Sequence, residues 1–180
     1  HTLETAPEGS RERLSATEQK VGFIPNMLAV MSESPVALEA YQGIQGTFAK
    51  STLSNAEQQF TALSISISNG CDYCVPVYSM FSAKAGVPQD IIDAVRDGNP
   101  IEDDRYSALR TFSAAIVEKR GQVSEAEIEA FLGTGFTKAQ VLEVILAVAF
   151  KLISNYTNQV ADIPLDEVFQ AYRWDGQKAA

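Results

Sequence analysis

The residues whose chemistry stands out lie in one stretch, 68–79, which holds the only two cysteines of the 180-residue chain. Cys71 and Cys74 are separated by two residues, and this C-x-x-C spacing is typical of half a zinc site or of a redox-active dithiol. A structural zinc site needs four ligands, usually Cys and His, and the only histidine is His1 at the start of the sequence. The redox dithiol is therefore preferred, with no metal and no cofactor expected. A third alternative is a pair of cysteines that merely pack in the core, since free cysteine behaves as a small hydrophobe.

The dithiol needs a folded scaffold, and the composition is that of an ordinary globular chain, with 46% hydrophobic and 21% charged residues. The length predicts a single domain. The net charge of −9 argues against nucleic acid and against an anionic membrane surface as partners. The longest apolar run, 141–153, is interrupted by Glu143 and Lys151 and is expected to be too short to span a bilayer. The polar N-terminal stretch resembles no signal peptide, and two cysteines form no disulfide framework, so a reducing, cytoplasmic location is expected.

Helix caps and apolar periodicity predict an all-α fold, a single-domain helical bundle. Capping boxes are expected at 54–57, 124–127 and 137–140, where a Ser or Thr precedes a Glu or Gln by three residues. Ser34-Pro35 is a further helix start. The expected helices cover 11–20, 26–31, a segment from 35, a segment from 55, 89–96, 103–120, 125–132 and 138 to about 159. The expected organisation is an N-terminal extension with a short helix (1–22), one helical domain (23–174) and a tail (175–180).

Two segments carry particular expectations. Residues 64–68 alternate Ser and Ile, and Asn69-Gly70 is a strong hairpin turn, so a β-hairpin with 75–78 is an alternative to two helices. The capping box at Ser54 and the lack of other strand partners favour helix–turn–helix. The helix predicted from 138 is apolar on nearly every side, which is typical of a buried central helix or of a subunit interface.

Several motifs together resemble the carboxymuconolactone decarboxylase-like family, in its alkylhydroperoxidase D-like branch. They are L-S-x-A-E at 53–57, N-G-C-x-Y-C-V at 69–75, A-G-V at 85–87, G-F-T-x-A-Q-V-L-E-V at 135–144 and S-N-Y-T-N at 154–158. The resemblance implies an all-helical protomer that assembles into a homo-oligomer, such as a trimer or hexamer. It also implies a cysteine pair at a helix N-terminus that reduces hydroperoxides with electrons from a dithiol reductant. In this resemblance Cys74 attacks the peroxide and Cys71 resolves the product.

Elementary chemistry agrees with such a role. Residues three apart on a helix are neighbours, so the two cysteines can close a disulfide. A helix N-terminus lowers the pKa of a nearby thiol and so favours the nucleophilic thiolate. The thiolate is oxidised by peroxide to a sulfenic acid, which the second cysteine converts to a disulfide. An external dithiol then restores the reduced pair.

Three positions depart from the proton relay of the family's peroxidases. Gln59 stands where those proteins carry a glutamate, Tyr78 where they carry a histidine, and Gln159 where a further histidine is common. All three side chains stay neutral near pH 7, so the alternative to a peroxide reductase is an impaired or redox-responsive oligomer without efficient turnover. Lactone decarboxylation is disfavoured because it needs groups that move protons and the interior of the chain has no histidine.

Overall fold

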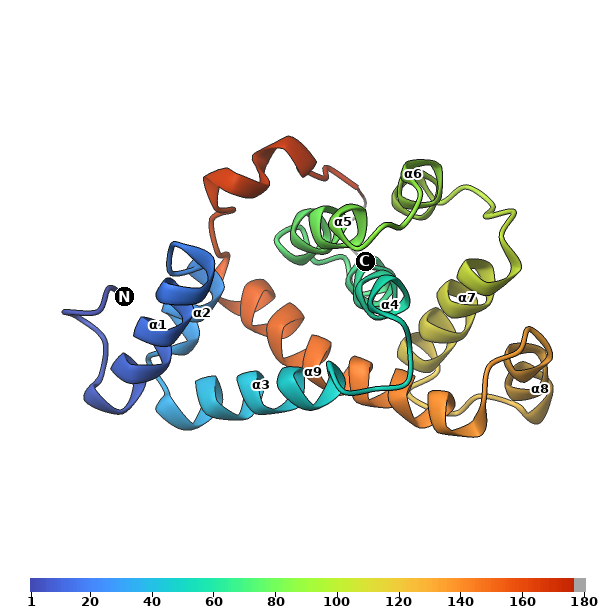
Figure 1. Ribbon diagram of the computed structural model, residues 1–180, viewed down its shortest axis with the longest axis horizontal. Helices are drawn as coiled ribbons and strands as arrows, with labels where there is room; N and C mark the ends of the chain where they lie inside the picture. The colour runs from blue at the N-terminus through green and yellow to red at the C-terminus, as the bar shows by residue number, and fades with distance from the viewer. Residues whose placement is uncertain (177–180) are drawn as a thin grey trace.

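The computed structural model describes residues 1–176, and helices are the only regular elements in that range (Figure 1). The all-α prediction is confirmed. The helices are α1 (Glu8–Val21), α2 (Asn26–Met31), α3 (Pro35–Phe48), α4 (Asn55–Ser68), α5 (Cys74–Lys84), α6 (Gln89–Asp97), α7 (Asp104–Glu118), α8 (Glu125–Gly133), α9 (Lys138–Ala161) and the 3-10 helix η1 (Glu167–Tyr172). The tail expected over 175–180 lies, for 177–180, outside the described residues.

Helix α4 forms the middle of the fold and packs against α5, α7 and α9 (Figure 1). Eight of its residues are buried, which makes it the central helix. The hairpin alternative for 64–68 is wrong, because the serines of the alternating pattern bond back to the preceding helical turn. Ser66 Oγ donates to the Ala62 carbonyl at 2.6 Å, and Ser68 Oγ donates to the Ser64 carbonyl at 3.1 Å.

The three predicted capping boxes are all present, at the starts of α4, α8 and α9. At α4 the Ser54 hydroxyl accepts from the Glu57 amide at 3.3 Å, and the Glu57 carboxylate accepts from the Ser54 amide at 2.8 Å. The Glu57 carboxylate also forms an ion pair with Arg105 of α7, in which Oε1 lies 2.6 Å from Nη2. Glu57 therefore ties α4 to α7 and takes no part in the cavity described below.

We expect Ser54→Ala to lower the free energy of unfolding by about 1 kcal/mol, the usual cost of losing an N-cap acceptor. Ser54→Asp keeps an acceptor oxygen at the cap and should retain most of the wild-type stability. Urea unfolding followed by circular dichroism measures both. Equal losses in the two variants would show that the cap hydrogen bond is not the cause.

Helix α9 corrects the expectation that no segment is long enough to span a bilayer. It has 24 residues and contains an 18-residue window of mean hydropathy 1.4, so by length and composition it is long and apolar enough to cross a membrane. Here it packs along α3 and α4, and 44% of that window is buried. It is a core helix with one uncovered side, since Leu142 is 67% exposed and Val160 is 89% exposed.

Helix α1 lies at the left end of the bundle, and the C-terminal segment crosses its top beside α5 (Figure 1). Helix α1 begins earlier than predicted, directly after Pro7, and packs against α3. The C-terminal segment crosses α5, where the Phe169 ring lies 6.2 Å from that of Phe81 and 6.3 Å from that of Phe23. Trp174 Nε1 donates to the Arg96 carbonyl of α6 at 3.2 Å. These contacts close the end of the bundle next to the cysteines.

Candidate active site

The two cysteines lie where α4 ends and α5 begins. Gly70 adopts a left-handed conformation with φ of 61°, which turns the chain between the two helices. Cys74 is the first residue of α5, whereas Cys71 lies in the preceding turn, so the expectation that both sit on one helical face is corrected. The Cys74 amide nevertheless donates to Cys71 Sγ at 3.3 Å, and both thiols are free. The turn therefore brings the pair together as a helix would.

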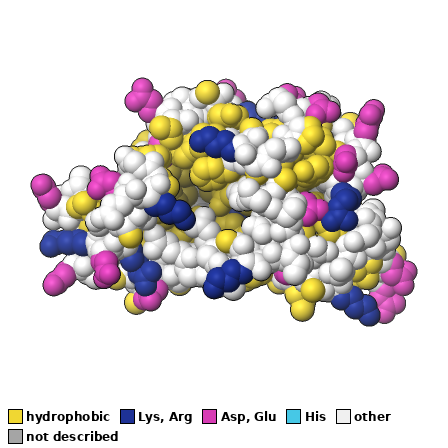
Figure 2. All heavy atoms as spheres, viewed as in Figure 1, with side chains coloured by type: hydrophobic (Ala, Val, Ile, Leu, Met, Phe, Trp, Pro, Cys, Tyr) yellow, Lys and Arg dark blue, Asp and Glu magenta, His cyan; other side chains and the backbone are white. Residues whose placement is uncertain are grey.

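A cavity of about 1120 Å³ opens in front of Cys74. Figure 2 shows hydrophobic side chains gathered in a hollow on this face of the molecule. The cavity is bounded by α1, α2, α3, α4, α5, α9 and η1. The residues that give it its apolar, aromatic wall include Met27, Leu28, Tyr41, Phe48, Val77, Tyr78, Phe81, Phe150 and Phe169. Cys74 lines it and Cys71 does not. A molecule in the cavity therefore meets the sulfur of Cys74 first.

The electrostatic surroundings shift the pKa values of the two thiols in opposite directions. Burial by itself would raise the pKa of Cys74, but a hydrogen bond from Cys71, the charge of Lys151 and the polar groups of Ser154 and Asn155 lower that pKa to about 6. The hydrogen bond that Cys71 donates to Cys74, together with burial, raises the pKa of Cys71. At neutral pH the pair is then one thiolate, Cys74, held by one thiol, Cys71. The amide groups at the start of α5 favour the same charge.

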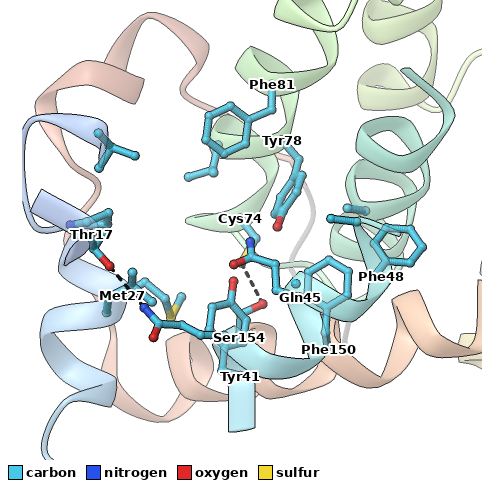
Figure 3. A pocket seen from close by; sticks show the side chains of 18 of the residues that line it. Thr17, Met27, Tyr41, Gln45, Phe48, Cys74, Tyr78, Phe81, Phe150 and Ser154 are labelled. Carbon is cyan, nitrogen blue, oxygen red and sulfur yellow. Dashed lines mark hydrogen bonds between the residues drawn. The ribbon is translucent and has the colours of Figure 1, made fainter. Parts of the chain in front are cut away.

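A polar cluster on α9 lies beneath Cys74, and the sequence analysis missed it (Figure 3). Cys74 Sγ lies 3.8 Å from Ser154 Oγ, and Lys151 Nζ donates to the same hydroxyl at 3.1 Å. Lys151 is fully buried, and its ammonium group lies 4.0 Å above the Tyr78 ring centroid. In the sequence, Lys151 stands out only as an interruption of an apolar run, and Ser154 and Asn155 only as the start of the S-N-Y-T-N motif one turn later.

The three positions singled out as a lost relay are not brought together. Tyr78 is buried in the cavity one turn after Cys74. Gln59 also lines the cavity, but its amide donates to Asn55 Oδ1 at 3.3 Å on its own helix. Gln159 is exposed outside the cavity and donates to the Asn69 carbonyl at 2.7 Å. Gln159 therefore links the end of α4 to α9. Of the three positions, Tyr78 is the nearest to Cys74 in sequence.

Tyr78→Phe is expected to leave the rate of any thiol reaction at Cys74 nearly unchanged. Burial first, and then the neighbouring charge of Cys74, raise the pKa of Tyr78, so its hydroxyl keeps its proton at neutral pH and cannot act as a general base. The phenyl ring preserves the face that lies against Lys151. Initial rates of peroxide consumption at pH 7 measure the effect. A general base contributes about 10²–10⁴-fold, and a loss of that size would make the hydroxyl a participant.

Metal ligation gains no support from the surroundings of the cysteines. In the part of the chain that the structure describes, no group of three or more His, Cys, Asp or Glu side chains could hold a metal ion. The groups that lower the pKa of Cys74 are instead the Cys71 thiol, the Lys151 ammonium group, the Ser154 hydroxyl and the Asn155 amide.

Comparison with known proteins agrees with this arrangement. Residues 35–99, which include the two cysteines and part of the cavity wall, match the model of the carboxymuconolactone decarboxylase family. This part of the chain is therefore similar to that family. No curated protein sequence matches it significantly.

Solved structures with the same fold cover nearly the whole of this chain. One is the alkylhydroperoxidase AhpD core, an uncharacterized peroxidase-related protein from Ralstonia eutropha JMP134, with 21% identity, a TM-score of 0.84 and coverage of 94% of this chain and 91% of that one. An uncharacterized peroxidase-related protein from Silicibacter sp. TM1040 has 17% identity, a TM-score of 0.80 and the same coverages. The debrominase Bmp8 in complex with 2,3,4-tribromopyrrole has 17% identity, a TM-score of 0.77 and coverage of 96% of both chains. The alkylhydroperoxidase D-like fold is thus established for this chain.

Proposed function

We propose that this protein is a thiol-dependent peroxide reductase in which Cys74 is the attacking residue and Cys71 the resolving one. One observation carries the proposal: the sulfur that faces the cavity is also the one whose pKa is lowered, to about 6. A nucleophilic thiolate needs both access to a substrate and a lowered pKa. Cys71 is fully buried, lies outside the cavity and has a raised pKa, which suits a thiol that reacts only with its neighbour.

The reaction balances with a hydroperoxide and a dithiol as its two substrates. The Cys74 thiolate attacks the terminal peroxide oxygen, the S–O bond forms, the O–O bond breaks, and the alkoxide leaves and takes up a proton. Sulfur is oxidised to a sulfenic acid while the peroxide is reduced to an alcohol. Cys71 then attacks Cys74 Sγ, and its proton leaves with the hydroxyl as water. An external dithiol reduces the resulting disulfide by exchange.

The reduced protein treated with one equivalent of an organic hydroperoxide tests the proposal. Two thiols should be lost together, the mass should fall by two hydrogens, and a dithiol should restore both thiols and support repeated turnover. Cumene hydroperoxide suits the aromatic wall of the cavity, and hydrogen peroxide is the small comparison. Reversible oxidation without turnover would favour a redox-responsive protein instead. Thiols that do not respond to either peroxide would contradict the proposal.

Reductive dehalogenation of an aromatic ring is a second candidate, favoured by the aromatic lining of the cavity and by the fold shared with a debrominase. The same dithiol would supply two electrons, so that an aryl bromide and two thiols give the arene, bromide, a proton and a disulfide. Bromide release from a brominated pyrrole, measured beside peroxide consumption under identical conditions, separates the two activities.

We also propose a homo-oligomer, a trimer or hexamer, in a reducing cytoplasmic compartment. The uncovered apolar side chains on α9, with Leu142 67% exposed and Val160 89% exposed, support a covering subunit. Light scattering coupled to size-exclusion chromatography should give a mass several times the 19.5 kDa of one chain. A monomeric mass would contradict this.

A further inference from the structure

Lys151 is a buried cation without an acidic partner. Its side chain is fully buried, and in the described range 1–176 no carboxylate forms an ion pair with it. Lysine is almost never fully buried unless it is paired, because an ammonium group loses its hydration there. The contacts that replace water are the Ser154 hydroxyl at 3.1 Å and the face of the Tyr78 ring at 4.0 Å. Neither brings a negative charge, so a counter-charge has to come from another group.

The Cys74 thiolate is the group placed to supply that charge. Ser154 Oγ lies between the two, 3.1 Å from Lys151 Nζ and 3.8 Å from Cys74 Sγ. This hydroxyl accepts from the ammonium group, so its one hydrogen is free to point either at the Lys151 carbonyl, 3.1 Å away, or at the sulfur. With its hydrogen turned toward the sulfur, the Ser154 hydroxyl would connect the Lys151 ammonium group to the Cys74 thiolate.

Asn155 adds a second donor beside the same sulfur. Its Oδ1 accepts from Asn69 Nδ2 at 3.0 Å, which fixes which way the amide points. Its Nδ2 is buried and has no hydrogen-bond partner, and the side chain lowers the pKa of Cys74. A buried amide donor left free in this way is costly unless a charged or polar group meets it during function.

Lys151 differs in charge from the other ionisable side chains around Cys74. The groups that face this sulfur from the elements packed on it are Cys71 and Tyr73 before α5, Tyr78 on α5, Tyr41 on α3 and Lys151 on α9. Burial raises the pKa of each of the three tyrosines, so they stay neutral. Among these groups Lys151 is the cation.

We propose that Lys151 is the positioning cation for the Cys74 thiolate and, through the Ser154 hydroxyl, the source of the proton that the leaving alkoxide takes up. The second half of this statement rests on the proposed peroxide reduction, whereas the first half does not. On attack the O–O bond breaks, the alkoxide takes the Ser154 proton, and Ser154 takes one from the ammonium group. The next Cys74 thiol returns a proton to Lys151 along the same chain. The cluster on α9 would then do the work that Gln59, Tyr78 and Gln159 cannot do.

The test is the pH titration of the Cys74 thiolate by its ultraviolet absorbance in the reduced full-length protein, with Cys74→Ser as the blank. Lys151→Met keeps the length of the side chain and removes its charge, and it should move the inflection up by about 1–3 pH units, the size expected for a nearby opposite charge. Lys138→Met is the matched control, because Lys138 lies on α9 like Lys151 but is exposed and does not line the cavity. It should leave the inflection in place. An unshifted inflection in a folded Lys151→Met protein would overturn the proposal.

Ser154→Ala keeps the experiment decisive if Lys151→Met does not fold. It should raise the inflection and slow the single-turnover reaction with cumene hydroperoxide, while Lys138→Met should do neither. If Ser154→Ala changes neither quantity, the relay is refuted. Because the titration uses no peroxide, a shifted inflection in a protein that never consumes peroxide would refute the proposed function alone. Peroxide turnover with an unshifted inflection would refute the role of Lys151 alone.

Discussion

Cys74→Ser is expected to reduce dithiol-dependent peroxide consumption to the uncatalysed background. Cys74 is the sulfur that lines the cavity, and its hydrogen-bonded, cation-flanked position gives it the lowered pKa of about 6. Serine keeps the size of the side chain, but its hydroxyl stays protonated and cannot accept the peroxide oxygen as a thiolate does. Steady-state consumption of cumene hydroperoxide with a dithiol donor measures the loss.

Cys71→Ser is the matched variant and should fail at a later step. Because Cys71 is buried behind Cys74 and does not line the cavity, its removal leaves the first oxidation possible but removes the resolving thiol. One equivalent of peroxide should be consumed, and a sulfenic acid should accumulate that a cyclic dione traps. Full turnover in Cys74→Ser, or none of the first step in Cys71→Ser, would reverse or refute the assigned roles.

The rate of the first oxidation should reach half of its maximum near pH 6 and stay level above neutral pH. The pKa of Cys74 is lowered to about 6 from an ordinary value of 9.0, so most of the molecules already carry the thiolate at pH 7. Single-turnover rates with hydrogen peroxide, measured from about pH 4.5 to about pH 10, give the pH profile. This range extends by about 2 units or less beyond the lowered and the ordinary pKa of Cys74. A rate that still rises through pH 9 would show an unperturbed thiol.

The lowered pKa of Cys74 also makes the free energy of unfolding depend on pH. The folded protein releases the Cys74 proton at a lower pH than the unfolded chain does, so the contribution is fully present above pH 9.0, decreases as the pH falls, and is lost below about 6. The difference in free energy of unfolding between the reduced wild type and Cys74→Ser should therefore grow from pH 6 to pH 9. Denaturant unfolding at these two pH values provides the check.

Local rules were sufficient to predict most of the scaffold. The capping boxes at Ser54, Ser124 and Thr137 placed three helix starts, because the hydrogen bonds that define them involve residues only three apart. The ambiguous segment 64–68 was decided by the capping box ahead of it and not by its own alternation. Serine tolerates a buried helix when its hydroxyl returns to the preceding carbonyl, as Ser66 does. Period-two patterns that contain serine are therefore weak indicators of strands.

The site was predictable only where the chemistry is local. Cys71 and Cys74 could be paired from spacing, and the motifs around them indicated the family. Lys151 and Ser154 are about eighty positions away from Cys74 in sequence and reach it through the packing of α9 against α4, which no local pattern encodes. Gln159 shows the converse, because a position suspected from the family pattern lies outside the cavity and bonds to a backbone carbonyl.

The central claim is that Cys74, and not Cys71, is the thiolate that a substrate meets. The most direct measurement treats the reduced wild-type protein at neutral pH with a small haloacetamide in less than stoichiometric amount, followed by peptide mapping of the label. Cys74 should carry nearly all of the label, because it is the deprotonated sulfur and it faces the cavity. Label found chiefly on Cys71, or shared equally between the two cysteines, would contradict the account.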